Sequence, residues 1–156
     1  MKKILIFSDT HGYIDSCINI ISSADMVSAV IHAGDCADDA DDLISIFPHI
    51  PIYHVKGNND FYTGAPSKLM LEIGGKNIFV THGHEYRVKY ESDYRTLAQK
   101  ALDADADLAI FGHTHIPYTG YIKNLTLLNP GSIRFSRTYA IAEIDGTTLK
   151  TKILDV

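Results

Sequence analysis

The stretch ILIFSDTHG, residues 4–12, joins four apolar side chains to a short loop that carries an aspartate and a histidine. A short apolar, β-branched run bounded by turn residues predicts a buried strand. Ligand-binding loops of open α/β sheets lie beyond the carboxyl ends of the strands. Asp9 and His11, which follow this run directly, are therefore expected at the functional edge of a sheet.

The same arrangement occurs four more times along the chain. Further apolar runs predict buried strands at residues 27–31, 52–55, 78–80 and 108–111. Each is followed by a loop rich in metal-ligand side chains: Gly34-Asp35, Gly57-Asn58-Asn59-Asp60, Thr81-His82-Gly83-His84 and Gly112-His113-Thr114-His115. The glycines allow the backbone to turn sharply and to approach a bound group closely. We therefore expect the five loops to meet in one site.

Helical periodicity separates the first strands and appears again later. Helices are predicted over residues 14–23, 38–47 and 92–104. Alternating strands and helices predict parallel strands joined by right-handed crossovers. The Gly74-Gly75 pair predicts a hairpin between residues 69–73 and 77–80. The remaining tail is β-rich, with strands expected at 118–122, 126–128, 139–144 and 149–154. A mixed α/β fold with two packed sheets and outer helices follows.

Length and composition exclude several classes of protein. A chain of 156 residues predicts one domain, residues 1–156, and 46% hydrophobic with 21% charged residues is typical of a folded globular protein. The net charge, 14 − 19 = −5, argues against a nucleic-acid polymer as partner. No apolar run approaches the ~20 residues that span a bilayer, and no signal peptide is recognised. Two cysteines without Cys-x-x-Cys spacing favour a reducing, cytoplasmic compartment.

The loop side chains form a mixed nitrogen and oxygen donor set without thiolate. Such a set suits Mn²⁺, Ni²⁺, Zn²⁺, Fe or Co²⁺ better than Ca²⁺ or Mg²⁺. A catalytic ion uses about three protein ligands, so a larger set indicates two divalent ions per chain. A carboxylate such as that of Asp35 could bridge two ions, because it offers two oxygens. The candidate ligands are Asp9, His11, Asp35, Asn58, His82, His113 and His115.

Together these motifs resemble the calcineurin-like metallophosphoesterase superfamily, and most of all its small single-domain YfcE-type phosphodiesterases. The match runs from Asp9 to the turn Asn129-Pro130-Gly131-Ser132. The resemblance implies a four-layer αββα sandwich with two mixed β-sheets. It also implies one ion, most readily Mn²⁺, on Asp9, His11, Asp35 and His115, and a second on Asp35, Asn58, His82 and His113. The implied activity is hydrolysis of a phosphodiester bond in a small substrate by a hydroxide that bridges the two metals.

One position departs from the wider superfamily. Many relatives carry a histidine after the asparagine ligand, thought to help the transition state or leaving group, whereas this chain has Asn59, as small members commonly do. We therefore assign His84, with Asn58 and Asp35, a catalytic part. Asn59, Arg134 and Arg137 are candidates for substrate binding. For His84, support of a ligand is an equal alternative, and for the arginines plain surface charge is the commoner one.

Several neighbouring side chains have more ordinary interpretations. His32 and His54 are expected to be hydrogen-bonded core histidines, and Asp60 could support the Asn58 loop through hydrogen bonds. Aromatic residues flank the expected site, where they could stack on a base or aryl group or pack beneath the loops. These are Phe61, Tyr62, Tyr86 and Tyr90.

Three alternatives to a phosphodiesterase remain open at this point. The same site could serve a phosphomonoesterase, and the same fold occurs in a non-catalytic retromer scaffold with a degraded metal site. Every ligand position is intact here, which disfavours the scaffold. A DNA nuclease of the superfamily would need capping regions for which 156 residues leave no room. The resemblance also makes a homodimer a possible assembly.

Overall fold

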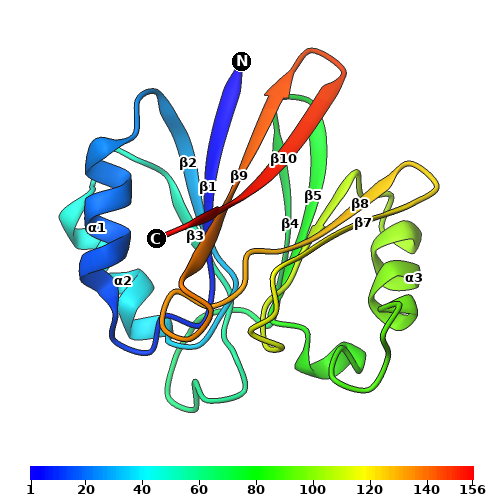
Figure 1. The fold of residues 1–156 in the computed structure, drawn as a ribbon, viewed down its shortest axis with the longest axis horizontal. Helices are drawn as coiled ribbons and strands as arrows, with labels where there is room; N and C mark the ends of the chain where they lie inside the picture. The colour runs from blue at the N-terminus through cyan, green and yellow to red at the C-terminus, as the bar shows by residue number, and fades with distance from the viewer.

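Two five-stranded sheets lie face to face with helices on their outer surfaces in the computed structural model, which describes all residues, 1–156 (Figure 1). The first sheet contains β1 (Lys2–Phe7), β2 (Val27–His32), β3 (Ile52–His54), β9 (Thr138–Asp145) and β10 (Thr148–Asp155). The second contains β4 (Lys68–Ile73), β5 (Lys76–Thr81), β6 (Leu108–Ile110), β7 (Tyr118–Ile122) and β8 (Leu125–Asn129). The helices are α1 (Ile14–Ser23), α2 (Ala37–Ile46), α3 (Arg95–Asp103) and the short 3₁₀ helix η1 (His84–Tyr86).

Both sheets mix parallel and antiparallel pairs, as expected. The strand orders are β10-β9-β1-β2-β3 and β4-β5-β6-β8-β7. Strands β1, β2 and β3 run parallel, as do β5, β6 and β8, and antiparallel strands complete each sheet. The expected hairpins are present, β4 with β5 and β9 with β10. Helices α1 and α2 cover the first sheet and α3 covers the second, which confirms the four-layer α/β sandwich.

Strand β1 shows why an uninterrupted apolar run forms the centre of this fold. Ile4 and Ile6 face the second sheet and join the core between the sheets, together with Ile78 and Ile110. The alternate residues, such as Leu5, face the helices and pack against α1 and α2. Side chains of a strand alternate between faces, so a strand covered on both sides must be apolar throughout.

None of the helices has both the length and the apolar composition that a membrane-spanning helix needs.

The predicted start of the third helix is three residues too early. The helix begins at Arg95, and Tyr94 before it has a left-handed backbone, with φ of 52°. The Glu91 carboxylate accepts hydrogen bonds from the Thr96 backbone N–H at 3.1 Å and the Thr96 hydroxyl at 2.8 Å. A carboxylate at a helix N-terminus satisfies a free N–H group and complements the helix dipole. Glu91 therefore fixes the start, in place of the predicted Ser92.

The carboxyl ends of the parallel strands lie at one end of the molecule, the lower edge of Figure 1. Hydrogen bonds join the two sheets there. His82, after β5, contacts the Ala33 carbonyl oxygen at 2.8 Å, and Ser132, after β8, donates its hydroxyl to the Asp9 carbonyl oxygen at 2.8 Å. The loops of the two sheets are therefore held as one unit.

Candidate metal centre

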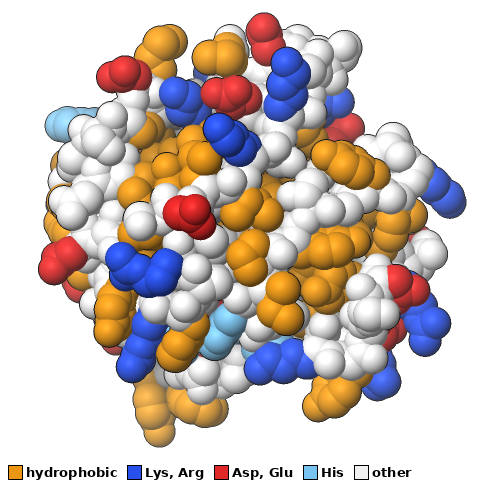
Figure 2. Space-filling view, in the orientation of Figure 1, with side chains coloured by type: hydrophobic (Ala, Val, Ile, Leu, Met, Phe, Trp, Pro, Cys, Tyr) orange, Lys and Arg blue, Asp and Glu red, His pale blue; other side chains and the backbone are white.

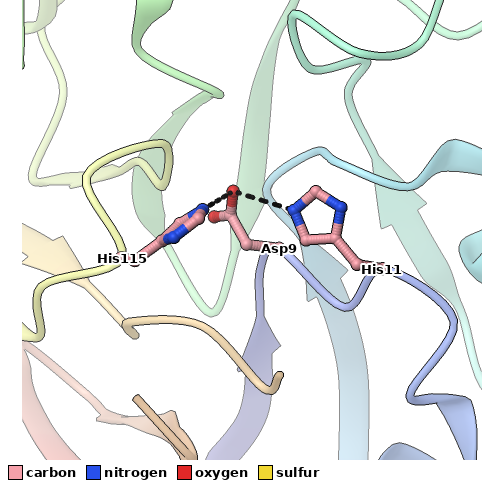
Figure 3. Close-up of side chains that lie close together, drawn as sticks. All are labelled: Asp9, His11 and His115. Atoms are coloured by element: carbon pink, nitrogen blue, oxygen red, sulfur yellow. Dashed lines mark hydrogen bonds and ion pairs between the residues drawn. The ribbon is translucent and has the colours of Figure 1, made fainter. Parts of the chain in front are cut away.

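Asp9 lies at the middle of the cluster of predicted ligands. Its Oδ1 atom is 3.1 Å from Nε2 of His115 and 4.0 Å from Nε2 of His11 (Figure 3). The three side chains come from two loops, one after β1 and one after β6. Their ligand atoms lie within 4.8 Å of one another, which makes them a group that could hold a metal ion.

A second group of the same kind shares Asp9. It contains Asp9, Asp35 and His82, all buried and with ligand atoms again within 4.8 Å. Asp35 Oδ2 lies 3.6 Å from His82 Nε2 and 3.9 Å from His11 Nε2, so this carboxylate faces an imidazole of each group. Asn58 places its Oδ1 3.0 Å from His82 Nε2. Six of the seven predicted ligands are thus brought together.

The protonation of His82 follows from its hydrogen bonds. Its Nδ1 lies 2.8 Å from the Ala33 carbonyl oxygen, which only accepts, so Nδ1 carries the proton and donates. In the neutral ring Nε2 then presents a lone pair, and it faces oxygens of Asn58, Asp35 and Asp9. The lone pair of His82 Nε2 therefore faces these oxygens with no proton of its own between them, an arrangement that a metal ion stabilises.

His11 and the two carboxylates lead to the same conclusion. Nε2 of His11 is buried and has no hydrogen-bond partner. Asp9 and Asp35 are both buried, yet only histidines lie within 4.0 Å of their oxygens as possible cationic partners. Burying carboxylates is costly unless a positive charge accompanies them. The residues present therefore fit divalent cations, and the donor set admits several transition metals.

The groups around Asp9 lower the pKa of its carboxyl. Burial alone would raise it, but the hydrogen bond from His115, the neighbouring His82 and the hydroxyl of Ser8 outweigh burial and lower the pKa below its ordinary value. Ser8 Oγ donates to Asp9 Oδ2 at 2.6 Å, and the His113 backbone N–H donates to the same oxygen at 3.1 Å. Asp9 is therefore ionised, and the two hydrogen bonds to Oδ2 fix its orientation. Its Oδ1 faces His115, His11 and His82.

His113 and His84 border the cluster on the His82 side. The His113 ring centroid is 5.0 Å from that of His82 and 6.0 Å from that of His84. Burial, followed by the neighbouring His82, lowers the pKa of His113 to about 4 and lowers that of His84 as well. The imidazole of His113 does not join the two groups of ligand atoms. Nδ1 of His84 is buried without a partner.

The backbone of the loops is unusual at the predicted ligands. Five of the seven have φ in the left-handed region, which residues with a Cβ seldom adopt: Asp9, His11, Asp35, His113 and His115. Two glycines also make room for the carboxylates. A Cβ on Gly57 would overlap Asp35 Oδ1, and one on Gly112 would lie 2.6 Å from Asp9 Oδ2. Strained backbone and such close approaches concentrate at functional sites.

Asp60 supports the Asn58 loop through hydrogen bonds, as predicted from the sequence. Its carboxylate accepts backbone N–H groups from Gly57 at 2.7 Å, Ala37 at 2.9 Å and Asp35 at 3.1 Å. Asn59 contacts Asp35 directly, since its backbone N–H donates to Oδ1 at 3.1 Å and its Nδ2 donates to Oδ2 at 2.7 Å. Asn59 therefore orients a carboxylate of the centre.

Two further supporting residues, Asn129 and Ser132, lie in the turn at which the family resemblance ends. Asn129 donates from Nδ2 to the Gly112 carbonyl oxygen and to the Thr114 hydroxyl, both at 3.0 Å. Together with Ser132 it attaches the turn after β8 to two ligand loops. These hydrogen bonds across the site distinguish the segment from an isolated surface turn.

A buried polar chain lies behind the Asp9 loop. The Thr10 hydroxyl donates to Asp39 Oδ2 at 2.6 Å, so it accepts from His32 Nε2, 2.9 Å away. His32 Nδ1 in turn accepts the backbone N–H of Gly34 at 3.2 Å. Burial lowers the pKa of His32 to about 4, so the ring is neutral at pH 7. His32 is the hydrogen-bonded core histidine that was predicted, and it links the Asp9 loop to the Asp35 loop.

Arg134, one of the two arginines predicted to bind substrate, lies over two aromatic rings, one of which contacts the ligand cluster. The Arg134 guanidinium carbon is 5.4 Å from the ring centroid of Tyr13 and 5.0 Å from that of Phe135. Phe135 stacks on His115, with centroids 4.8 Å apart and planes at 11°. Arg137 is exposed and follows in the same loop. Sequence reasoning missed Phe135, because an exposed aromatic residue in a loop has no pattern that marks it.

The two groups of ligand atoms differ in composition from the two predicted ligand sets. The first predicted set is represented by Asp9, His11 and His115, but the carboxylate shared between the two groups is Asp9. Asp35 was predicted to bridge two ions, and its Oδ2 lies 3.9 Å from His11 Nε2 and 3.6 Å from His82 Nε2, so it faces an imidazole of each group. The bridging part of Asp35 stays a prediction.

Basic side chains lie near the centre in spite of the acidic net charge. Histidine atoms are visible in the lower middle of Figure 2, with lysine or arginine side chains to the left and right of them. Lys89 and Lys56 are close enough to contribute to the lowered pKa of His113 and of His84. Positive groups at the rim favour an anionic substrate.

Sequence comparison relates the whole chain to proteins of one family. The model of the calcineurin-like phosphoesterase superfamily domain matches residues 1–147. The probable metallophosphoesterase YsnB of Bacillus subtilis is 31% identical over 98% of this chain and 90% of its own length. The phosphodiesterase MJ0936 of Methanocaldococcus jannaschii is 26% identical over 83% of this chain and 82% of its own length.

Solved structures share the fold. A conserved uncharacterised protein of Streptococcus pneumoniae, described as a predicted phosphoesterase, superposes with a TM-score of 0.83 at 32% identity, covering 99% of this chain and 89% of that one. Vps29 of Entamoeba histolytica, complexed with Zn²⁺, gives a TM-score of 0.76 at 21% identity, covering 98% of each chain, which shows likeness of fold alone. The family match over residues 1–147 and the similarity to YsnB show that the chain belongs to the calcineurin-like phosphoesterase superfamily, the metallophosphoesterases, and is a hydrolase.

Proposed function

We propose that the Asp/His centre holds two divalent ions and hydrolyses a phosphodiester bond in a small substrate. The observation that carries the proposal is the pair of potential ligand groups that share Asp9, with each group's ligand atoms within 4.8 Å. When bound, a pair of divalent ions supplies an activated water and neutralises charge on the phosphoryl group. This chemistry needs no covalent intermediate on a protein side chain.

The chain's own residues then orient the ligands and contact the substrate. Asp35 is held by Asn59 and, through its backbone N–H, by Asp60, so its oxygens are fixed before a substrate arrives. Neutral His84 lies 5.6 Å from His82, centroid to centroid, at the edge of the cluster. We assign His84 to hydrogen bonding with the phosphate or the leaving group. Asn58 completes the ligands on the His82 side.

The arginines would act on the substrate outside the ligand cluster. Arg134 is packed against Tyr13 and Phe135, so its guanidinium has a defined place on the His115 side of the centre. A charge held in this way can bind a phosphate oxygen with less loss of side-chain entropy than a free arginine. Arg137 would add charge to the same side.

A diester is favoured over a monoester by the relatives. The similarity to a protein named phosphodiesterase, together with the resemblance to the small YfcE-type enzymes, supports this preference. A phosphomonoesterase is the alternative on the same site, and hydrolysis of paired substrates separates the two. A non-catalytic scaffold is the weaker alternative, since all the predicted ligand residues are retained.

The identity of the ions, the compartment and the assembly belong to the same proposal. Mixed carboxylate, amide and imidazole donors support Mn²⁺, with Ni²⁺, Zn²⁺, Fe or Co²⁺ as alternatives set by availability. The two free cysteines support a cytoplasmic location. The negative net charge supports a small phosphoester, not a nucleic-acid polymer, as the substrate. A homodimer is the assembly that we expect.

The direct test is metal analysis of the purified protein together with turnover of bis(p-nitrophenyl) phosphate and p-nitrophenyl phosphate after Mn²⁺ is added. We expect about two ions per chain and a higher kcat/KM for the diester. Higher turnover of the monoester would establish the alternative, and two bound ions without turnover of any phosphoester would favour the scaffold.

Two ligand variants provide the control. Asp35→Ala and Asn58→Ala should reduce turnover by more than ~100-fold, since outer partners of a metal already matter by 10–100-fold. Circular dichroism should remain that of the wild type, because neither side chain contributes to the apolar core. Substantial activity in Asp35→Ala would contradict the proposed centre.

A further inference from the structure

A cavity of about 190 Å³ lies beside the metal centre and shares Asn59 with it. Asn59 lines the cavity and also donates its side-chain N–H to Asp35. The other walls come from residues 36–38, where α2 begins, and from residues 60–63 after β3. Sites for whole drug-sized ligands usually exceed about 300 Å³, so this cavity suits one ring system of a larger substrate.

Two aromatic side chains form the outer wall of this cavity. Phe61 is 80% exposed and Tyr62 is 102% exposed, so neither ring packs beneath its loop. The sequence left open whether these residues stack on a ligand or pack beneath the loops, and their exposure excludes packing beneath the loops. Flat apolar rings that face water beside a substrate site can stack on a planar group, which gives affinity without requiring a particular base.

The base of the aromatic loop is fixed relative to the metal centre. Asp60, directly before Phe61, accepts backbone N–H groups of Gly57, Ala37 and Asp35 within 3.1 Å. These bonds join the aromatic loop, the start of α2 and the Asp35 loop. The backbone that carries the two rings is therefore fixed relative to Asp35, as a substrate that spans the cavity and the centre requires.

The charges that line the cavity disfavour phosphate there. The lining includes Asp38 and Asp60 and no lysine or arginine. Lys56 and Lys89 do not line the cavity and act instead on the histidines of the centre, Lys56 on His84 and Lys89 on His113. An anionic phosphate is thus favoured at the metal centre, and a neutral planar group is favoured in the cavity.

We propose that this cavity binds the nucleobase of a nucleoside phosphate ester whose phosphate group lies at the Asp/His centre. The inference rests on the proposed function, because it takes the centre to be the phosphate site. The inference adds a substrate class, nucleoside phosphate esters, and assigns recognition of the base to Phe61 and Tyr62.

The test compares two ligands that differ only by a base. Titration calorimetry on the Mn²⁺-loaded protein would measure the Kd of adenosine 5′-monophosphate and of ribose 5-phosphate. The wild type should bind the nucleotide about tenfold more tightly, the effect expected of one base stacked on aromatic side chains. The double variant Phe61→Leu/Tyr62→Leu should bind the two ligands equally within about twofold, since leucine keeps apolar volume but offers no stacking face.

Tyr121→Leu is the matched control, because Tyr121 is a tyrosine on β7, outside the cavity, and is 73% exposed. It should keep the wild-type ratio of the two Kd values. Equal binding of the two ligands by the wild type, or an undiminished preference in the double variant, would overturn the inference. Turnover of bis(p-nitrophenyl) phosphate by the same preparation tests the proposed function separately. A base preference that the double variant loses, without any turnover, would support the subsite and reject the activity.

Discussion

The ring of Phe135 lies nearly parallel to the imidazole of His115, with centroids 4.8 Å apart and planes at 11°. Phe135 also meets the His11 ring edge-on at 5.6 Å. Phe135 therefore packs against both imidazoles of the Asp9 group. Its ring also contacts the Arg134 guanidinium. The orientation of two potential ligands depends on a side chain that has no donor atom of its own.

Phe135→Ala should weaken metal binding by about tenfold, comparable with the loss of other groups that orient metal ligands. The physical reason is that His115 and His11 would lose the surface that restricts their rings. Mn²⁺ titration followed by calorimetry measures the affinity. Phe135→Tyr keeps the ring and should bind metal as the wild type does. Unchanged affinity in Phe135→Ala would show that the Asp9 hydrogen bond alone orients His115.

Gly112→Ala should strongly weaken metal binding although it replaces no ligand. A Cβ at this position would overlap the hydroxyl of Ser8 and lie 2.6 Å from Asp9 Oδ2, so the carboxylate must move. We expect the affinity for Mn²⁺ to fall by more than ~100-fold, as for a ligand whose supporting contacts are lost. Gly64→Ala is the control, since a Cβ there meets no atom within 4 Å. Near-normal binding by Gly112→Ala would mean that the loops adapt freely.

Stability should fall in acid because of His32. Burial lowers its pKa from 6.5 to about 4, so between these values the unfolded chain binds a proton that the folded chain does not. The free energy of unfolding should therefore decrease by about 3 kcal/mol from pH 6.5 to pH 4 through this residue, and stay level above pH 6.5.

His32→Gln removes the titrating group and keeps an amide that can donate to Thr10. Urea unfolding in EDTA at several pH values gives the slopes, which should be shallower for the variant between pH 4 and 6.5. His113, whose pKa is also lowered to about 4, is present in both chains, so the difference reports His32. Identical slopes would show that His32 is protonated in the folded protein.

Metal removal should destabilise the protein, because ions at the centre would neutralise two buried carboxylates, those of Asp9 and Asp35. At a hundredfold excess over its Kd, Mn²⁺ should add about 2.7 kcal/mol to the free energy of unfolding. Thermal unfolding with Mn²⁺ and with EDTA measures the difference. The variant Asp9→Asn should gain far less from Mn²⁺, and an equal gain would place the stabilising ion elsewhere.

Much of this architecture could be predicted because it depends on local patterns. Apolar runs such as residues 4–7 marked the central strands, and the Gly74-Gly75 pair marked a hairpin. The ligand loops were found because the carboxyl ends of parallel strands meet at one edge of a sheet. The start of α3 was predicted wrongly, because the Glu91 carboxylate and the left-handed Tyr94 decide it, and neither has a simple periodic signal.

The sequence by itself determined the order of strands and helices, the family and the residues that can bind metal, because these follow from periodicity and from short motifs after each strand. Only the tertiary structure decided that Asp9 is the carboxylate shared by both groups, that Ser132 holds its backbone from 123 residues away, and that Phe135 covers His115. Contacts between loops of two separate sheets depend on how those sheets pack, and no local pattern in the chain specifies that packing.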